Sequence, residues 1–224
     1  ARVDGIRWIR LHYAYPHGLP KGFLAAMAEE EKVCRYVDIP LQHASGSVLK
    51  RMRRGVTRAG QERILDRIRE HVSGVALRTT FIVGFPGETD EDFDILCDFV
   101  REQRFDHVGV FTYFDEDGID ALSLDGKVPE AVKQERQQEL MGLQAAISRE
   151  RLQARVGQTL DVLIEGVSDE SELLLKGRTE FQAPEVDGQV FVASAPEGVR
   201  AGQILPVRIT QSSEHDLAGE PVSA

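Results

Sequence analysis

The stretch from Ala76 to Asp92, which reads ALRTTFIVGFPGETDED, constrains the fold more than any other part of the chain. Within it, the apolar run 81–83 shows no alternation of polar and apolar residues, which is typical of a strand buried on both faces of a parallel sheet covered by helices. The turn 84–88 follows, and Thr89 is a good N-cap for a helix whose first turn is acidic. The stretch therefore predicts a strand, a tight turn and a helix of an α/β protein, and such proteins bind ligands at the carboxyl ends of their strands.

The turn 84–88, GFPGE, lacks the features of a phosphate-binding loop. It has no Gly-Lys-Ser/Thr ending, and the carboxylates of residues 90–92 would repel an anion. A neutral or cationic ligand, or one bound through backbone and ring contacts, fits the turn better. The alternative is that GFPGE is only a tight connection between a strand and a helix.

Strand and helix patterns alternate up to about residue 155. We predict strands at 6–15, 36–39, about 77–83 and 107–113, and helices at 23–30, 45–52, 57–72, from 89 onward and at 129–154. This order is typical of βαβ units and a parallel sheet.

The sequence after Gly157 has a different texture. Short apolar segments at 159–164, 172–176, 190–193 and 204–209 are separated by breaks rich in glycine and proline. Such a pattern is typical of a small all-β barrel or sandwich. We therefore predict two domains, an α/β domain at 1–155 and an all-β domain at 156–224.

The negative charge is concentrated in the second domain. The chain of 224 residues has a net charge of −10, and residues 157–224 contain 4 basic and 12 acidic residues, which is a net charge of −8. A surface of this sign repels nucleic-acid phosphates and attracts a basic protein. The composition therefore argues against RNA binding and allows a basic protein partner.

The sequence points neither to a membrane nor to an oxidising compartment. No apolar run reaches the roughly 18 residues of a membrane-spanning helix, and we find no secretory signal. Cys34 and Cys97 are 63 residues apart, which suits neither a metal motif nor a disulfide framework. We expect a cytoplasmic protein whose two thiols belong to the core. Because residue 1 is Ala and the first strand begins almost at once, we also expect a fragment.

Candidate site residues lie where the predicted strands end. Gln42 and Ser45 have neutral donors and acceptors that suit hydroxyl or amide groups. His43 is either a general base or a structural hydrogen-bonding residue. Glu88 either binds a cationic group or supports the helix after it. The same edge should also bring together the side chains of Tyr13, Tyr15, Tyr113 and Asp115.

The basic run 50–54, KRMRR, also allows two interpretations. Its arginines can bind a carboxylate or a phosphate, or they form the solvated end of a helix. The six histidines show no paired metal-ligand spacing, and no Gly-x-Ser-x-Gly nucleophile motif occurs. The residues by themselves thus predict an α/β half-barrel that binds a polar ligand, followed by an acidic β-domain.

Several segments together resemble one enzyme family. YVDIPLQHAS, VLKRMRRG, LRTTFIVGFPGETDEDF and VGVFTY resemble the radical SAM methylthiotransferases, and the resemblance runs through essentially the whole chain. The all-β domain resembles a TRAM domain, and its segments RTEFQAPEVDGQVFV and HDLAGE are similar to the RimO branch. The resemblance implies four of the six parallel strands of a partial, TIM-like radical SAM barrel, followed by a small TRAM β-barrel.

The resemblance also implies a function. Enzymes of the RimO branch add a methylthio group to the β-carbon of an aspartate in small ribosomal subunit protein twelve, with S-adenosylmethionine and two 4Fe–4S clusters as cofactors. The implied partners are this basic ribosomal protein and an iron–sulfur or sulfur donor. The cluster-binding cysteines of the family have no counterpart here, so we expect a C-terminal fragment that is inactive by itself.

Two alternatives stay open. A MiaB-like enzyme would modify tRNA and use its TRAM domain on RNA, although the net charge of −8 favours a protein substrate. The other alternative is a non-catalytic scaffold that binds S-adenosylmethionine or a partner.

The cofactor-binding residues that the resemblance implies are Gln42, Ser45, Arg53, Gly84, Phe85 and Glu88. Gln42 and Ser45 would lie at the ribose and methionine parts of S-adenosylmethionine, and Arg53 would pair with its carboxylate. Gly84 and Phe85 would lie near the adenine, in the turn that ends at Glu88 and forms one wall of the pocket. The resemblance implies no catalytic side chain and no metal ligand in this chain.

Overall fold

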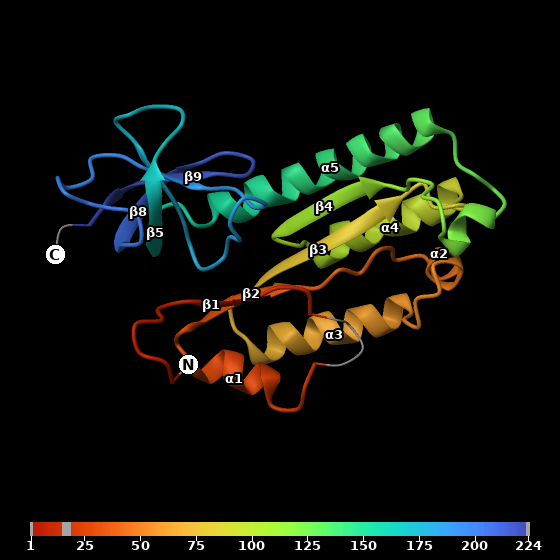
Figure 1. Ribbon diagram of the computed structural model, residues 1–224, viewed down its shortest axis with the longest axis horizontal. Coiled ribbons are helices and arrows are strands. Elements are labelled where there is room, and N and C mark those ends of the chain that lie inside the picture. Colours follow the sequence, from red (N-terminus) through yellow and green to blue (C-terminus); the bar gives the residue numbers. More distant parts are fainter. Residues whose placement is uncertain (1, 15–18, 223–224) are drawn as a thin grey trace. The chain divides into compact units, whose positions relative to one another are not determined.

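The computed structural model describes residues 2–14 and 19–222 (Figure 1). The chain divides into two compact units. Residues 11–31 and 37–144 form the first, called the α/β unit, and residues 1–10, 32–36 and 145–224 form the second, called the barrel unit. The predicted division into 1–155 and 156–224 stays a prediction. None of the helices in the described part of the chain is long and apolar enough to cross a membrane.

One sheet has its strands in the order of the sequence. These are β1 (Ile9–Leu11), β2 (Val33–Asp38), β3 (Ala76–Val83) and β4 (His107–Thr112). β3 and β4 pair in parallel, from Arg78 opposite His107 to Val83 opposite Thr112. Beyond the end of β2, Gln42 makes a further parallel bridge to Phe81 of β3. Parallel neighbours that are consecutive in the chain need a crossover connection, which is what βαβ units provide.

Helices occupy these crossovers. They are α1 (Phe23–Glu29), α2 (Gly46–Arg51), α3 (Arg58–His71) and α4 (Asp90–Gln103). A short 3-10 helix, η1 (Asp120–Ser123), and the long helix α5 (Glu130–Gln153) follow β4. Figure 1 shows α4 running alongside β3 and β4. The predicted helices are all present, with ends that differ by a residue or two.

The two faces of β3 differ in burial. Phe81 and Val83 are 0% exposed, whereas Ile82 between them is partly exposed. Phe81 packs edge-to-face on Phe99 of α4, with ring centroids 6.3 Å apart. The other face is open because Ile82 lines a cavity. The predicted burial of the run 81–83 on both faces is therefore wrong at Ile82, since a cavity replaces packed side chains on that face of β3.

The start of α4 follows the prediction. Thr89 Oγ1 accepts a hydrogen bond from the Asp92 amide at 3.2 Å, and Asp92 Oδ2 accepts one from the Thr89 amide at 3.0 Å. This reciprocal capping box satisfies amides that have no partner within the helix. Cys97 lies on the buried stripe of α4, where burial raises the pKa of its thiol to about 11. Cys34 is also buried and unbonded, so both predicted core thiols are confirmed.

The first strand is shorter than the predicted 6–15. It covers Ile9–Leu11, and Tyr13 beyond it has a φ of 59° and is 80% exposed. A left-handed residue ends an extended run, although aromatic and β-branched residues favour a strand there. The predicted site residue Tyr15 lies outside the described residues.

The strands after α5 close into a barrel. They are β5 (Thr159–Val167), β6 (Leu175–Arg178), β7 (Val190–Val192), β8 (Ile204–Ser212) and β9 (Leu217–Pro221), in the spatial order β5-β6-β7-β9-β8. Neighbours pair antiparallel except β7 and β9, which are parallel. Its core holds apolar side chains that are at most 2% exposed, namely Val162, Ile164, Val190, Val192, Val207, Ile209 and Leu217. The predicted fold class, a parallel α/β sheet followed by a small all-β barrel, is confirmed.

β5 and β8 each extend three residues past their predicted ends, 164 and 209, and two other barrel strands differ more. β6 begins at Leu175 because the residues before it form a turn, in which the Leu174 amide donates to Ser171 O. β9 was not predicted because its sequence, LAGEP, contains glycine and proline, which disfavour strands. Gly219 is needed in β9, since a Cβ at this position would collide with the backbone oxygen of Arg208 on β8.

We expect Phe81→Ala to destabilise the α/β unit strongly. The side chain is fully buried against Phe99 and Phe105, and truncation at such a site costs about 3–5 kcal/mol. Phe114→Ala is the matched control, because Phe114 is 78% exposed and should change the free energy of unfolding by no more than about 0.5 kcal/mol. Urea unfolding followed by circular dichroism measures both changes. Equal effects of the two substitutions would contradict the assignment of Phe81 to the core.

Candidate functional site

A cavity of about 610 Å³ lies in the α/β unit, near the carboxyl ends of β2 and β3. Gln42, Ile82 and Phe85 line it from the sheet edge and the following turn, residues 51–54 line it from the end of α2, and most of the segment 118–124 lines it from the connection after β4. Cavities of roughly 300–1,000 Å³ suit a nucleotide-sized or drug-sized ligand. The position agrees with the general rule that parallel α/β sheets bind ligands at this edge.

Gln42 is held against β3 by its backbone. Its amide donates to Thr80 O at 2.9 Å, and its carbonyl accepts from the Ile82 amide at 2.8 Å. Its φ of 70° is unusual for a residue other than glycine, and the two hydrogen bonds stabilise this conformation. Gln42 is thereby fixed in the cavity wall.

The turn 84–88 is packed tightly against its surroundings. Gly84 has a φ of 72°, and a Cβ there would collide with the side chain of Lys133. Phe85 packs edge-to-face on Tyr113, with ring centroids 5.0 Å apart, and is 7% exposed. The remaining exposed part of Phe85 belongs to the cavity wall. Only glycine fits at position 84, and Phe85 is the residue of this turn that reaches the cavity.

Glu88 supports the turn from inside the protein. Its Oε2 accepts the Gly84 amide at 2.9 Å, and its Oε1 pairs with Arg136 Nη1 at 2.8 Å. His43 Nε2 lies 3.4 Å from Glu88 Oε2. Because His43 Nδ1 accepts the Ser45 amide at 2.9 Å, the proton of a neutral ring is on Nε2, facing the carboxylate. His43 is 0% exposed and does not line the cavity, so the geometry favours its structural role over that of a general base.

Ser45 is held inside the protein by the carboxylate of Asp92. Its hydroxyl donates to Asp92 Oδ1 at 2.5 Å, Ser47 donates to the same oxygen, and Thr89 donates to the other. Ser45 is 2% exposed and lies outside the cavity lining. Burial acts to raise the pKa of Asp92, but these hydrogen bonds to the carboxylate outweigh it and lower the pKa to about 2.

The arginines of the basic run differ in their contacts. Arg51 Nε donates to Pro86 O at 2.8 Å, and its Nη2 donates to Asp125 O at 2.8 Å and Oδ1 at 2.6 Å. Arg53 forms an ion pair of 2.5 Å with Asp120, and both side chains are 78% exposed. Arg54 is partly buried and lines the cavity. Residues 51–54 of the run thus line the cavity, and the binding of a carboxylate or phosphate by its arginines stays a prediction.

Two further predicted site residues, Tyr113 and Asp115, contact each other after β4. Tyr113 donates to Asp115 Oδ1 at 2.9 Å, and Lys127 pairs with the same carboxylate. The segment 118–124 was missed as part of the site, although the apolar residues in this connection after β4 are a usable signal. In residues 2–14 and 19–222, no group of three or more His, Cys, Asp or Glu side chains is placed to hold a metal ion.

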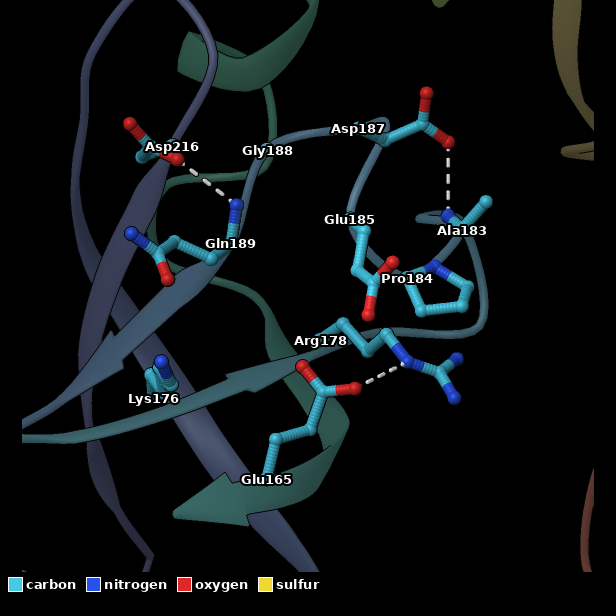
Figure 2. A pocket seen from close by; sticks show the side chains of 10 residues that line it. All are labelled: Glu165, Lys176, Arg178, Ala183, Pro184, Glu185, Asp187, Gly188, Gln189 and Asp216. Carbon is cyan, nitrogen blue, oxygen red and sulfur yellow. Dashed lines mark hydrogen bonds and ion pairs between the residues drawn. The ribbon is translucent and has the colours of Figure 1, made fainter. Parts of the chain in front are cut away.

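A second cavity, of about 440 Å³, lies in the barrel unit (Figure 2). Figure 2 shows Arg178 and Glu165 pointing toward one another, with Arg178 Nε donating to Glu165 Oε1 at 2.8 Å. Asp187 accepts the Ala183 amide and Asp216 accepts the Gln189 amide, each at 2.8 Å. Two of the four carboxylates that line it, those of Asp187 and Asp216, thus stabilise local loops.

We expect Asp92→Asn to destabilise the protein in a pH-dependent way. Because the pKa of Asp92 is lower in the folded state, its hydrogen bonds stabilise the fold above the unfolded pKa of about 3.9, and this contribution is lost as the pH falls towards about 2. Near neutral pH the substitution should cost about 1–3 kcal/mol. The difference from the unmodified protein should shrink between about pH 4 and pH 2, which urea unfolding at several pH values measures.

Asp94→Asn is the control for this experiment, because Asp94 is an exposed carboxylate on the same helix. It should change the free energy of unfolding by less than about 0.5 kcal/mol at every pH of the series. A pH-independent effect of Asp92→Asn would contradict the low pKa of this carboxyl group.

Two families of known proteins match the sequence. Residues 1–100 match the Radical SAM superfamily, and residues 156–222 match the TRAM domain. The second match covers the strands that form the closed barrel.

Curated relatives match along the whole chain. The chain is 47% identical over 224 residues to a protein of Anaeromyxobacter sp. (strain K) and 49% identical over 222 residues to one of Geotalea uraniireducens (strain Rf4), and both are named ribosomal protein uS12 methylthiotransferase RimO. The alignments cover 100% and 99% of this chain, but 47% and 49% of the relatives. The chain thus spans about half the length of the curated relatives it matches.

A solved structure shares the fold. Coproporphyrinogen III oxidase (HemN) from Escherichia coli, described as a radical SAM enzyme, has a TM-score of 0.53 over 77% of this chain and 46% of that chain, at 13% identity. Such low identity supports the fold only, whereas the family matches and the relatives support membership. The chain therefore belongs to the radical SAM superfamily and, with its TRAM domain, to the RimO-like group of methylthiotransferase sequences.

Proposed function

We propose that the chain is the part of a methylthiotransferase that binds S-adenosylmethionine and contacts the substrate, an aspartate of ribosomal protein uS12 that receives a methylthio group on its β-carbon. The relatives at 47% and 49% identity carry the name of this activity and are about twice as long. The observation that supports the proposal best is the cavity of about 610 Å³ at the carboxyl ends of β2 and β3.

The lining of this cavity suits S-adenosylmethionine. Phe85, Ile82 and Met52 offer an aromatic and aliphatic wall for an adenine ring, and the Gln42 carboxamide can bind ribose hydroxyls. Guanidinium groups at 53 and 54 can pair with a carboxylate. When bound, S-adenosylmethionine supplies the methyl group and the radical chemistry that activates a C–H bond.

The other proposed site residues act through neighbours. Glu88 holds the Gly84 amide, and the Gly84 backbone leads directly into Phe85. Ser45 is hydrogen-bonded to Asp92, so it positions the start of α2. We therefore propose Gln42, Phe85 and Arg53 as contacts of the cofactor, and the buried residues as supports that keep these contacts in place. Arg53 can exchange Asp120 for a ligand, because an exposed ion pair stabilises by only about 0–1 kcal/mol.

The residues present do not fit a 4Fe–4S cluster. A cluster needs several thiolate ligands, and the chain has only Cys34 and Cys97. Both are 2% exposed, and burial raises the pKa of each thiol, so neither is a thiolate at neutral pH. We propose that the rest of the longer enzyme ligates the clusters, and that this chain by itself does not cleave S-adenosylmethionine.

The charge of the TRAM domain supports a protein substrate. Residues 157–224 carry a net charge of −8, which opposes binding to an RNA backbone and favours a basic ribosomal protein. Glu185 exemplifies this surface, because it is exposed and makes no hydrogen bond or ion pair with a described residue. Because ribosomes are made in the cytoplasm, a ribosomal-protein substrate implies a cytoplasmic location.

We expect the chain to bind S-adenosylhomocysteine, a stable analogue of the cofactor, with Phe85 beside the base. Phe85→Leu keeps an apolar side chain but removes the ring, and should weaken binding by about 5- to 100-fold, since a base–aromatic contact contributes about 1–3 kcal/mol. Isothermal titration calorimetry measures the affinity. Phe114→Leu, outside the cavity, is the control. Equal affinity of the Phe85→Leu variant and the unmodified chain would contradict the proposed pocket.

We expect the chain to bind purified uS12 in preference to tRNA. Binding to uS12 should weaken as salt is raised, because charge complementarity contributes to it. Glu185→Lys reverses an exposed charge on the TRAM domain and should weaken binding several-fold, whereas Glu91→Lys, an exposed residue of α4, is the charge-matched control. Biolayer interferometry at several salt concentrations measures these affinities. Retention of tRNA and not of uS12 would favour the tRNA-modifying alternative.

A further inference from the structure

We propose that Gln61 of α3 is a positioning residue for the cavity of the α/β unit, because its carboxamide holds residues 41–43 in the tight turn that presents Gln42 to this cavity. The inference rests on the proposed function, in which Gln42 contacts the cofactor. Gln61 itself does not line the cavity. It would thus influence binding without touching the ligand.

Residues 41–43 form a tight turn just after β2. The His43 amide donates to Leu41 O at 2.9 Å, which closes a γ-turn around Gln42. The φ of 70° at Gln42 belongs to the form of this turn that is rare and strained for a residue with a side chain. Such a conformation persists only where the surrounding structure holds it. If φ returned to its common negative range, the Cβ of Gln42 and the carboxamide beyond it would point in a different direction.

Gln61 binds the turn on both sides of Gln42. Its Nε2 donates to Leu41 O at 3.2 Å and to His43 O at 2.9 Å. A carboxamide nitrogen carries two hydrogens, so both of its donors are used on the turn. β3 holds the middle of the turn through the two backbone hydrogen bonds of Gln42, and Gln61 holds the carbonyl groups that flank it. The strained residue is therefore fixed by two different elements.

The position of Gln61 in α3 is one that usually holds an apolar residue. Gln61, Leu65 and Ile68 have the spacing of one helix face, and each is 0% exposed. A buried carboxamide is unfavourable unless it is hydrogen-bonded. Gln61 Oε1 has no hydrogen-bond partner among residues 2–14 and 19–222, which adds a penalty that an apolar side chain would avoid. The two hydrogen bonds from its nitrogen to the turn are the interactions that distinguish Gln61 from an apolar residue at this position.

A double-mutant cycle measured by calorimetry on the 224-residue chain tests this role, with S-adenosylhomocysteine as the ligand. Gln61→Met keeps the length of the side chain but removes both donors. We expect it to weaken binding by about 3- to 10-fold, since the hydrogen bonding of Gln42 to the ligand is then impaired. In a Gln42→Ala background, which already lacks the carboxamide, Gln61→Met should cause no further loss.

Gln144 of α5 provides a matched control. It is 3% exposed, its Nε2 donates to Phe105 O at 3.0 Å and to Asp106 O at 3.4 Å, and its Oε1 has no partner in the described part of the chain. These contacts precede β4 and are not part of the cavity lining. Gln144→Met removes the same kinds of interaction and should leave the affinity unchanged. If Gln61→Met does not fold, Gln61→Glu replaces it, because this side chain has the same shape but can donate to at most one of the two carbonyl groups.

Nuclear magnetic resonance observes the turn itself, without a ligand. The one-bond coupling between Cα and Hα depends on the sign of φ, so this coupling at Gln42 reports whether the left-handed conformation is kept. We expect Gln61→Met to shift the coupling towards the value of a residue with negative φ. Gln144→Met should leave it unchanged.

A loss of affinity that requires the Gln42 carboxamide, together with a shifted coupling, supports the inference. Equal weakening by Gln61→Met in the presence and in the absence of this carboxamide would overturn it, because Gln61 would then act through the fold as a whole. An unmodified chain that binds S-adenosylhomocysteine, combined with full affinity of Gln61→Met, would overturn the inference and leave the proposed function intact. Failure of the unmodified chain to bind this nucleoside would overturn the proposed function, and the positioning role of Gln61 with it.

Discussion

The buried carboxylate of Glu88 joins three parts of the α/β unit. It accepts the amide of Gly84, pairs with Arg136 of α5 at 2.8 Å, and lies 3.4 Å from His43, which follows β2. A charge without solvent access is tolerated only when it is paired and hydrogen-bonded, and loss of one partner typically costs about 3–5 kcal/mol. The turn, the sheet edge and α5 are therefore stabilised together. The position of Phe85 on the cavity wall is a consequence of this arrangement.

The same arrangement changes the electrostatics expected at the turn. The three carboxylates at 90–92 suggested that an anionic ligand would be repelled. In the structure, however, Asp90 pairs with Arg136 at 2.6 Å, and Asp92 accepts hydrogen bonds from Ser45, Ser47 and Thr89. Two of the three carboxylates are thus held by partners within the protein, Asp90 by a guanidinium and Asp92 by hydroxyl groups. The guanidinium groups after α2 dominate the lining of the cavity instead, which suits a ligand that combines an apolar ring with a carboxylate.

Local sequence signals predicted the elements well where short-range physics decides them. The cap at Thr89 and the buried stripe of α4 depend on residues within one helix, and both are present. Predictions were less accurate where a distant partner decides. The strand at 6–15 is reduced to Ile9–Leu11, and β9 forms only because β7 and β8 provide edges for it. Among the proposed site residues, Gln42, Arg53 and Phe85 line the cavity, whereas Ser45, Gly84 and Glu88 lie behind it.

The sequence by itself determined the class of fold, the strand ends at which a site can form, and the negative charge of the TRAM domain. These properties depend on periodicity, turn residues and composition, which are local or additive. Only the tertiary structure decided which polar groups face the cavity. The left-handed backbone of Gln42 and the inward turn of Glu88 arise from hydrogen bonds to β3 and α5, residues far away in the chain. Whether an arginine of the run 50–54 has a partner likewise depends on the segment 118–125, because ion pairs form between side chains that folding brings together.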